Sequence, residues 1–337
     1  MRAVRVDEFG DSSALSCADV DVPRVGPNQV LVQMSYAGVN FVDIYNRTGL
    51  YPLALPFTIG KEGSGVIVAR GASVSEAEFP DGHRVSFVAA EGTYAEYVVV
   101  DADKTMPVPA GVSLEQAAAV GMQGLTAHYL VTSTYPVQQG DLVLIHAGAG
   151  GTGSLLVQMA KQRGARVLTT VSSEKKAEIA RRNGADHVII YTECEFDQEV
   201  RKVTDGVGVH VVYDSVGAST WEKSLACLRC RGHLVLFGNA SGPVPPIDPL
   251  RLCRSGSITL VRPTLAHYVT TRADLLDRIR DIYRWVAAGT LDVHIGRILP
   301  LGDAAKAQDL LAARKTTGKI LLQVDTDDVE SGKSVLI

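Results

Sequence analysis

The chain has 337 residues, of which 46% are hydrophobic and 21% are charged, and its formal net charge is −4. This length exceeds what one hydrophobic core usually supports, so we expect two domains, which allows a cleft between them. The composition excludes a disordered, collagen-like or coiled-coil chain. The acidic balance argues against nucleic acid as the main partner, because phosphate binding needs clustered Lys and Arg.

The N-terminus and the cysteines bear on location and redox state. The first residues, MRAVRVDEFG, lack the apolar segment of a signal peptide. No run of about 18 apolar residues is present, so we expect a cytoplasmic protein that does not enter a membrane. The five cysteines are scattered, which predicts free thiols. We interpret the C-x-x-C of Cys227 and Cys230 as two thiols on a partly buried helix, since no second Cys or His pair completes a zinc site.

In chain order, the first elements are short β-rich runs over residues 1–120, such as 29–34 and 94–99, separated by Gly, Pro and Asn turns. This pattern predicts an antiparallel, barrel-like domain. From residue 141 onward, short apolar runs alternate with helical segments, which is typical of a parallel sheet built from βαβ units. The expected strands are 142–145, 166–171, 187–190, 209–213, 233–237 and 257–261.

The last third of the chain carries further elements. Apolar residues at helical spacing predict a helix with a buried face over residues 272–288. A strand at 295–299, a helix at 303–314 and a strand at 319–324 follow. Residues 325–337 are acidic and contain Gly and Ser, so we expect a flexible tail.

A glycine-rich turn follows the strand predicted at 142–145. Its pattern is Gly148-x-Gly150-x-x-Gly153, and a helical segment begins directly after it. In this context Gly148 makes the tight turn, Gly150 lets the backbone approach a pyrophosphate, and Gly153 lets the helix pack close to the strand. The helix N-terminus then offers N–H groups to the phosphates. The sequence therefore predicts a dinucleotide-binding turn.

The residues after the strand at 166–171 bear on which dinucleotide binds. An NAD-specific fold carries an acidic residue about 20 positions beyond the turn to bind the ribose hydroxyls. The acid nearest that place is Glu174, which we interpret as favouring the start of the next helix, with Ser172 or Ser173 as its cap. The small serines leave room for a 2′-phosphate, and Lys175 or Lys176 supplies positive charge. These residues favour NADPH over NADH.

Residues 140–161, GDLVLIHAGAGGTGSLLVQMAK, resemble the signature of quinone oxidoreductases related to zeta-crystallin, within the medium-chain dehydrogenase/reductase superfamily. The segments GVNFVDIYNRTGLYP, QGLTAHYL, VVYDSVG, FGNASG and RPTLAHYVTTR agree, and the similarity spans residues 1–324. The resemblance implies an α/β plus β fold, in which a GroES-like β-rich catalytic domain holds an inserted Rossmann doubly wound parallel sheet. The expected bounds are 1–124 and 264–324 for the catalytic domain and 125–263 for the Rossmann domain.

The resemblance also implies roles for particular residues. Asn40, Tyr45 and Tyr51 would line the cleft near the nicotinamide, and the strand at 258–262, Ile258 to Arg262, would pair with its twin in a homodimer. The implied cofactor-binding residues, together with those of the glycine turn, are Thr126, Gly148, Gly150, Gly151, Thr152, Gly153, Ser172, Lys176, Tyr191, Phe237, Gly238, Asn239 and Arg314. Two departures, Lys61 and Gln123, rearrange the charge of the cleft relative to the family.

Zinc-dependent members of the same superfamily hold a catalytic zinc with a Cys, a His-Glu pair and a distal Cys. Here Asn40 stands at the first position and Lys61 stands before Glu62, so this ligand set is broken. The segment AAEGTYAEYVVVDAD also lacks the four cysteines of the structural zinc lobe. We therefore expect no metal. Without a Lewis acid a simple ketone or alcohol is difficult to polarise, which favours an activated acceptor.

The resulting hypothesis is a zinc-independent enzyme that transfers reducing equivalents from NADPH to quinones. Tyr45, Tyr51 and Asn40 would orient the acceptor carbonyls, and water or Tyr51 would provide protons. Each tyrosine has an alternative role as a packing aromatic. One alternative function is NADPH-dependent reduction of activated C=C bonds in enones or enals. Another is an NADPH-binding role as a crystallin-like or RNA-binding protein. The lack of a basic stripe argues against RNA as the main partner.

Overall fold

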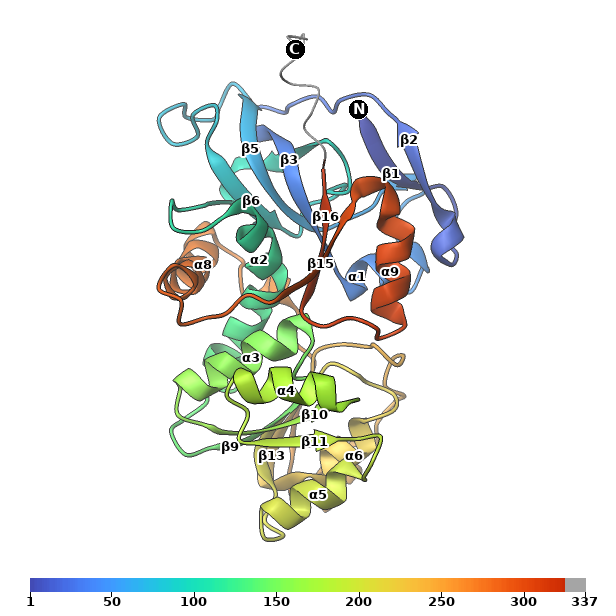
Figure 1. Cartoon of the computed structure of the whole chain (residues 1–337), viewed down its shortest axis with the longest axis vertical. Coiled ribbons are helices and arrows are strands. Elements are labelled where there is room, and N and C mark those ends of the chain that lie inside the picture. The colour runs from blue at the N-terminus through green and yellow to red at the C-terminus, as the bar shows by residue number, and fades with distance from the viewer. Residues whose placement is uncertain (325–337) are drawn as a thin grey trace. The chain divides into compact units, whose positions relative to one another are not determined.

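The computed structural model describes residues 1–324, so the tail predicted at 325–337 lies outside the described residues. The chain forms two compact units. Unit 1 comprises Met1–Met122 and the described residues from Ile295 onward, and unit 2 comprises Gln123–His294. Figure 1 shows both units coloured along the chain.

Unit 1 is built on β-sheets. Its larger sheet has the order β15-β16-β3-β5-β6-β8, with β7 also paired to β3, and all pairs except β15 with β16 are antiparallel. The strands are β3 (Gln29–Val39), β5 (Glu62–Arg70), β6 (Arg84–Val88), β7 (Tyr97–Asp101), β8 (Thr105–Pro107), β15 (Ile295–Pro300) and β16 (Lys319–Gln323). A smaller sheet consists of β2 (Leu15–Asp19), β1 (Arg2–Val6) and β4 (Phe57–Thr58).

The core of unit 1 is built by these sheets and helix α9 (Ala304–Ala312), against which helix α1 (Phe41–Arg47) packs. Val30, Val32 and Met34, which alternate along β3, belong to this core, as the period of two in a strand requires. Asn40 is the N-cap of α1, and its backbone N–H donates to Oδ2 of Asp43 at 2.8 Å, which completes a capping box. Asn40 and Asp43 are therefore held in place by each other at the N-terminus of α1.

Unit 2 holds a six-stranded parallel sheet in the order β11-β10-β9-β12-β13-β14. The strands are β9 (Leu142–His146), β10 (Arg166–Val171), β11 (His187–Ile190), β12 (Val209–Asp214), β13 (Leu228–Leu236) and β14 (Thr259–Val261). The helices of this unit are α3 (Gly151–Gln162), α4 (Glu174–Arg182), α5 (Phe196–Val203), α6 (Trp221–Ala226), α7 (Pro249–Arg254) and α8 (Arg272–Ala287). Numbered within the unit, the strand order is 3-2-1-4-5-6, which is the Rossmann order. The predicted fold class is confirmed.

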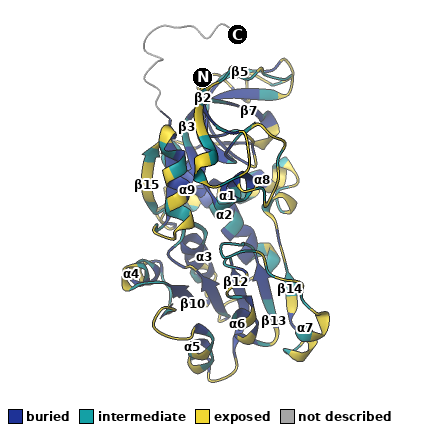
Figure 2. Ribbon diagram, turned by 90° about the vertical axis from the view of Figure 1, so that its right-hand side faces the viewer, coloured by how far each residue is buried: buried dark blue, intermediate teal, exposed yellow. Residues whose placement is uncertain are grey.

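Burial follows this architecture. The strands of the parallel sheet are rich in Val, Leu and Ile, and Figure 2 shows them as mostly buried, while the outer faces of the helices are exposed. Helix α2 (Leu114–Tyr129) runs from unit 1 into unit 2 and ends in a π-helical turn, Leu130–Thr134. No helix of the described residues is long and apolar enough to cross a membrane.

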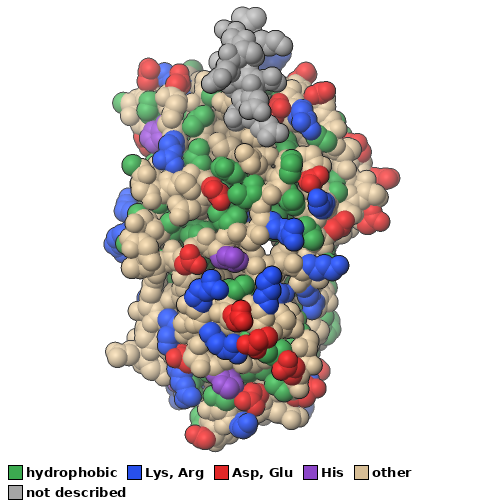
Figure 3. Space-filling model, viewed as in Figure 1, with side chains coloured by type: hydrophobic (Ala, Val, Ile, Leu, Met, Phe, Trp, Pro, Cys, Tyr) green, Lys and Arg blue, Asp and Glu red, His purple; other side chains and the backbone are tan. Residues whose placement is uncertain are grey.

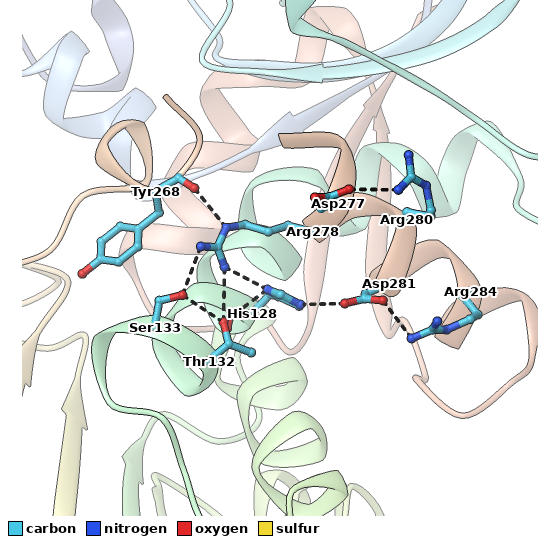
Figure 4. Close-up of polar contacts among 9 residues, drawn as sticks. All are labelled: His128, Thr132, Ser133, Tyr268, Asp277, Arg278, Arg280, Asp281 and Arg284. Carbon is cyan, nitrogen blue, oxygen red and sulfur yellow. Dashed lines mark hydrogen bonds and ion pairs between the residues drawn. The ribbon is translucent and has the colours of Figure 1, made fainter. Parts of the chain in front are cut away.

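Helix α8 groups with unit 2, whereas the sequence places residues 264–294 in the completed catalytic domain. The contacts of Arg278 explain this position (Figure 4). Its guanidinium donates to the Tyr268 carbonyl at 2.9 Å and to the hydroxyls of Thr132 and Ser133 at 3.2 and 3.0 Å, all within unit 2. The spacing of apolar residues predicts the helix, but side chains of the π-helical turn determine where it packs. The bounds expected from the sequence for the catalytic and Rossmann domains, taken as functional domains, stay a prediction.

The C-x-x-C pair does not lie on a helix, so that part of the sequence interpretation is wrong. Helix α6 ends at Ala226, Cys227 follows as its C-cap, and Cys230 lies in β13. Cys227 is buried, which raises the pKa of its thiol to about 12, while Cys230 is exposed. Strand β13 begins five residues before the expected 233, because the polar run at 229–233 hides its start.

Candidate functional site

The glycine turn connects β9 to α3 at the carboxyl edge of the parallel sheet. A Cβ on Gly148 would lie 2.1 Å from Oγ1 of Thr169, and one on Gly153 would lie 2.2 Å from the carbonyl oxygen of Ala147. A Cβ on Gly150 would have a nearest neighbour at 3.2 Å, again the Ala147 oxygen. Gly148 and Gly153 therefore serve close packing, and the surface of Gly150 is the most accessible of the three. The packing of Gly153 agrees with the sequence analysis, which gave Gly148 the tight turn and Gly150 the approach to a pyrophosphate; the roles of these glycines at a cofactor stay a prediction.

The start of α3 fits a dinucleotide pyrophosphate. The first intrahelical bond runs from the Ser154 N–H to the Gly150 carbonyl at 2.9 Å. The N–H groups of Gly151, Thr152 and Gly153 precede it and have no carbonyl partner within the helix. These N–H groups and the positive end of the helix dipole are the features that favour phosphate at a helix N-terminus, and phosphate binding here stays a prediction. The strand order reverses between β9 and β12, where open α/β sheets bind their ligands.

The residues predicted to select NADPH lie at the neighbouring strand ends. Ser172 directly follows β10, and Tyr191 directly follows β11, with its N–H bonded to the Val171 carbonyl at 3.0 Å. Lys176 lies in the first turn of α4. The structure therefore brings Ser172, Lys176 and Tyr191 to the same sheet edge as the glycine turn. Glu174 is exposed and pairs with Arg181 along its own helix, as expected for an acid that favours a helix start.

The serine cap of α4 differs in one respect from the expectation. Ser173 is the N-cap residue and has extended backbone angles, but its side chain accepts no hydrogen bond from the helix. The Ser173 carbonyl instead accepts from the N–H groups of Lys176 and Ala177 at 3.1 and 3.0 Å. The Ser173 hydroxyl is therefore not used by the cap.

The opposite side of the edge is built around Asp214, a fully buried residue at the end of β12 that the sequence analysis did not single out. Its carboxylate accepts from the N–H groups of Val216 and Gly217 at 2.8 and 3.0 Å, and from the hydroxyls of Thr220 and Ser224 at 2.8 Å. Ser224 also contacts Nε2 of the buried His146 at 2.9 Å. Asp214 therefore fixes the loop after β12.

The loop after β12 packs on the loop after β13, which contains Phe237, Gly238 and Asn239. The Phe237 N–H donates to the Asp214 carbonyl at 2.9 Å. A Cβ on Gly238 would lie 2.4 Å from the carbonyl oxygen of Ser215, so the two loops touch through their backbones. The three residues predicted as a wall of the cofactor site are half-buried and lie at the same edge as the glycine turn.

Two further predicted cofactor residues lie apart from this edge in the chain. Thr126 is half-buried on α2, one turn after Gln123, whose side chain lies directly against Gly151 of the glycine turn. Arg314 belongs to unit 1, where it follows α9, is exposed and has a left-handed φ of 57°. The role of Arg314 at the cofactor stays a prediction.

In unit 1, three polar residues from distant parts of the chain form a buried cluster. The amide of Asn40 donates to Oε1 of Glu62 at 2.7 Å and to the Gly38 carbonyl at 3.3 Å. The ammonium of Lys319 donates to Oδ1 of Asn40 at 2.9 Å and also to Oε1 of Glu62. The Met122 N–H donates to Oε2 of Glu62 at 2.6 Å. We call Asn40, Glu62 and Lys319 the buried triad.

Two members of the triad, Asn40 and Glu62, stand at positions that the sequence analysis compares with the zinc ligand set of zinc-dependent enzymes. Glu62 is fully engaged by nitrogen donors, and Lys61 points away to pair with Glu91 at 3.3 Å. Within residues 1–324, no group of three or more His, Cys, Asp or Glu side chains has the arrangement of a metal site. The donor set around Glu62 therefore consists of an amide, an ammonium and a backbone N–H, none of which is a zinc ligand.

The two predicted tyrosines lie together at the end of α1, with Tyr45 in the helix and Tyr51 after it. The rings of Tyr45 and Tyr51 meet edge to face with centroids 5.2 Å apart, and the Tyr51 N–H donates to the Tyr45 carbonyl at 3.0 Å. Tyr51 is 39% exposed and Tyr45 is half-buried. Both therefore have accessible surface, Tyr45 on the helix that Asn40 caps and Tyr51 in the segment that follows it.

Asp43 is a second buried carboxyl beside the triad. Its Oδ2 accepts from the Tyr94 hydroxyl and the Asn40 N–H, each at 2.8 Å, while Oδ1 has no partner among the described residues. Burial raises the pKa of Asp43 to about 7, although these bonds and the charge of Lys319 act to lower it. Asp43 therefore keeps a proton over much of the acidic range.

The raised pKa of Asp43 predicts a pH dependence of stability. A carboxyl whose pKa is higher in the folded than in the unfolded state stabilises the fold below the unfolded pKa, and this stabilisation is lost as pH rises to about 7. We expect Asp43→Asn to be more favourable relative to wild type at pH 8 than at pH 5, by about 2 kcal/mol. Denaturant unfolding at both pH values tests this, with the exposed Asp21→Asn as control. Equal differences at pH 5 and pH 8 would contradict it.

Sequence reasoning missed Lys319, Asp43 and Asp214. Asp43 follows Asn40 by three residues, which is a capping-box spacing that could have been noticed. Asp214 directly follows the strand predicted at 209–213, in the segment VVYDSVG, a position where a buried carboxylate needs partners. Lys319 gave no such signal, because its partners lie 279 and 257 residues away in the chain.

Comparisons with known proteins agree with both units. Residues 26–110 match the alcohol dehydrogenase GroES-like domain, and residues 151–281 match the zinc-binding dehydrogenase family. A GroES-like unit and a Rossmann unit in this arrangement along the chain define a medium-chain dehydrogenase/reductase.

Relatives place the chain more narrowly. It is 39% identical over 323 residues to a quinone oxidoreductase of Pseudomonas aeruginosa, covering 95% of this chain and 99% of the relative. It is 39% identical to a 2-haloacrylate reductase of a Burkholderia species, covering 90% and 93%. The structure of Escherichia coli quinone oxidoreductase complexed with NADPH superposes with a TM-score of 0.93 at 36% identity, covering 96% and 100%. The chain belongs to the quinone oxidoreductase family, and the predicted family is confirmed.

Proposed function

We propose that this protein is a zinc-independent reductase that uses NADPH to reduce quinones. The observation that carries the proposal is the combination of a complete dinucleotide turn in unit 2 with a triad in unit 1 that holds Glu62 with nitrogen donors in place of zinc ligands. Without an electrophilic metal at Glu62, the acceptor must already be electron-poor, as a quinone is. The relatives named as quinone oxidoreductases support this reading.

The chain's own residues bind the cofactor and orient the acceptor. The N–H groups at the start of α3 hold the pyrophosphate, and Phe237 to Asn239 form one wall of the cofactor site. Bound NADPH supplies the reducing equivalents. Tyr45, Tyr51 and Asn40 orient the acceptor, and water or the exposed Tyr51 hydroxyl delivers protons.

The primary test is NADPH oxidation by the chelator-treated protein with 1,2- and 1,4-quinones, followed by absorbance at 340 nm. We expect turnover that survives chelation. Activated C=C substrates, including a 2-haloacrylate, run beside the quinones because one relative is named a 2-haloacrylate reductase. Turnover of these substrates but not of quinones would replace the proposal with the reduction of activated C=C bonds.

Lys176→Ala tests the assignment of the cofactor. Lys176 lies at the same sheet edge as Ser172 and Tyr191, where the 2′-phosphate of NADPH would bind. Removing its charge should raise the Kd for NADPH by about tenfold and leave the Kd for NADH nearly unchanged. Fluorescence titration measures both, with Lys202→Ala on α5 as a matched surface control. Equal losses for both nucleotides would contradict the 2′-phosphate role.

We also propose a homodimer formed through residues 258–262. Strand β14 is the outer strand of the parallel sheet and pairs with β13 on one side only. An edge strand offers backbone groups that a second copy can pair with. Light scattering should give twice the chain mass, and a Pro at Leu260 should reduce it to that of a monomer. A cytoplasmic location stays a prediction.

Charge on the surface agrees with a small-molecule function. On the face shown in Figure 3, Lys and Arg side chains are interspersed with Asp and Glu. Many of them form ion pairs, such as Lys161 with Asp186 at 2.8 Å. This face therefore has the mixed charge of an ordinary solvated surface.

A further inference from the structure

Helix α2 is buried along most of its length and is open at one short window. From Ala117 to Tyr129 every residue is buried except Met122, Gln123 and Thr126, which are half-buried. Gln123 and Thr126 are three positions apart, so their side chains lie on the same face of the helix. The open face of α2 therefore presents an amide and a hydroxyl.

The Gln123 side chain fills the space beside Gly151, the first residue of α3. A Cβ on Gly151 would lie 2.0 Å from Oε1 and 2.4 Å from both Cδ and Nε2 of Gln123, so no side chain fits at position 151. Because these three atoms are at nearly equal distances from this point, the flat carboxamide faces the Gly151 Cα. Its N–H and C=O groups lie in the plane of the carboxamide and extend past Gly151, at the N-terminus of α3.

The polar atoms of this open face have no partner in the protein. Within residues 1–324, the side chains of Gln123 and Thr126 form no hydrogen bond or ion pair. Comparable side chains of unit 2 are bonded. Thr132 and Thr204 donate to the carbonyl four residues back at 2.7 and 2.8 Å, and Gln158 bonds the backbone of residue 292 through both ends of its amide. The Gln123 amide is therefore available to a ligand at the start of α3.

We infer that Gln123 is a cofactor-binding residue whose amide N–H donates to a phosphate oxygen of the dinucleotide pyrophosphate. This inference rests on the proposed function, in which NADPH binds at the glycine turn. A phosphate that reaches the N–H groups at the start of α3 lies beside Gly151, and so beside the edge of the Gln123 carboxamide. An ionised phosphate only accepts hydrogen bonds, so Nε2 and not Oε1 faces it.

This role differs from that of Lys176. The pyrophosphate is common to NADPH and NADH, whereas the 2′-phosphate belongs to NADPH alone. Gln123 therefore contributes to the affinity for both nucleotides without distinguishing them. An amide adds a donor without adding charge, so replacing it by lysine or glutamate changes the sign of the electrostatic contribution at an otherwise similar side-chain length.

The test compares Gln123→Leu, Gln123→Glu and Gln123→Lys, with Gln139→Leu as control. Gln139 is exposed and precedes β9, at the opposite edge of the parallel sheet from the glycine turn. For each variant, titration gives the Kd for NADPH, for NADH and for adenosine 2′-monophosphate, which has a 2′-phosphate but no pyrophosphate. The thermal midpoint of the protein without nucleotide reports whether the packing against Gly151 is kept.

We expect Gln123→Leu to raise the Kd for NADPH and for NADH by about fivefold each, and to leave the Kd for adenosine 2′-monophosphate and the thermal midpoint unchanged. Gln123→Glu should bind both dinucleotides more weakly than Gln123→Leu. Gln123→Lys should bind both more tightly than wild type, with an affinity that falls more steeply as salt rises. The control should bind all three ligands as wild type does.

Three results would overturn the inference. They are wild-type affinity in Gln123→Leu, a loss confined to NADPH, and an equal loss for adenosine 2′-monophosphate. A glutamate variant that binds as tightly as the leucine variant would overturn it too, because no phosphate would then lie beside the side chain. Wild-type protein that binds NADPH but reduces no quinone would overturn the proposed function alone, since the role of Gln123 is measured by binding.

Discussion

Asp214→Ala should destabilise unit 2 by about 4 kcal/mol, because it leaves several buried donors without their acceptor. The Asp214 carboxylate is fully buried and accepts from two backbone N–H groups and two hydroxyls. The Gly217 N–H and the Ser224 hydroxyl donate to it in buried bonds, so each of these loses a bond that water does not readily replace. This is the largest effect we expect from a single side chain that does not touch a substrate.

Tryptophan fluorescence in a denaturant titration measures this change. Both tryptophans of the chain, Trp221 and Trp285, lie in unit 2, and Trp221 is the first residue of α6 after Thr220. The matched control is Asp248→Ala, which removes an exposed carboxylate that caps α7 by accepting from the Leu250 N–H at 2.9 Å. We expect the control to cost about 1 kcal/mol. Equal losses in the two variants would show that the Asp214 network adds nothing beyond an ordinary cap.

Gly153→Val should abolish measurable NADPH binding, with a loss of affinity of about 100-fold or more. Its Cβ would lie 2.2 Å from the oxygen and 2.8 Å from the carbon of the Ala147 carbonyl, which are backbone atoms that cannot rotate away. Helix α3 must then move from β9, and the N–H groups of its first turn move with it. The thermal midpoint of unit 2 should fall as well, because the helix and strand lose their packing.

Gly150→Ala separates binding from folding. A Cβ there would have its nearest neighbour at 3.2 Å, so the fold needs only a small adjustment. We expect the thermal midpoint to stay close to wild type while NADPH affinity falls, because the methyl group lies where the pyrophosphate approaches. Titration of NADPH fluorescence and circular dichroism give the two quantities. Wild-type affinity in Gly153→Val, or unfolding in Gly150→Ala, would reverse the roles of these glycines.

Local pattern was sufficient to predict most of unit 2. The strands at 142–145, 166–171 and 187–190 are buried apolar runs between helices, and the structure confirms them as β9, β10 and β11. The glycine turn was predictable because its function depends on spacing along the chain. The start of β13 was missed because residues 229–233 are mostly polar, and its register with β12 shifts between Val209 and Val211.

The buried triad could not be predicted in the same way. Asn40 and Glu62 were recognised as positions of a broken zinc site, but their partner Lys319 depends on how β16 pairs with β3. A lysine at the start of a strand near the C-terminus reads as a surface charge, since lysine is rarely fully buried. The packing position of α8 could not be predicted for the same reason. It depends on Arg278, which bonds hydroxyls of a π-helical turn that the apolar spacing of the sequence does not indicate.

The split of unit 1 along the chain sets an order of events during synthesis. Residues 123–294 form one continuous stretch and can complete their sheet as they leave the ribosome. Unit 1 must wait, because β3 does not meet β16 until residues 319–323 have been made. Until then Asn40 and Glu62 lack Lys319, and residues 36–39 of β3 lack their partner strand. Strand β16, the last strand among residues 1–324, therefore completes the sheet that β3 begins, and a chain cut short before residue 319 would keep its Rossmann unit but lack the charge that balances Glu62.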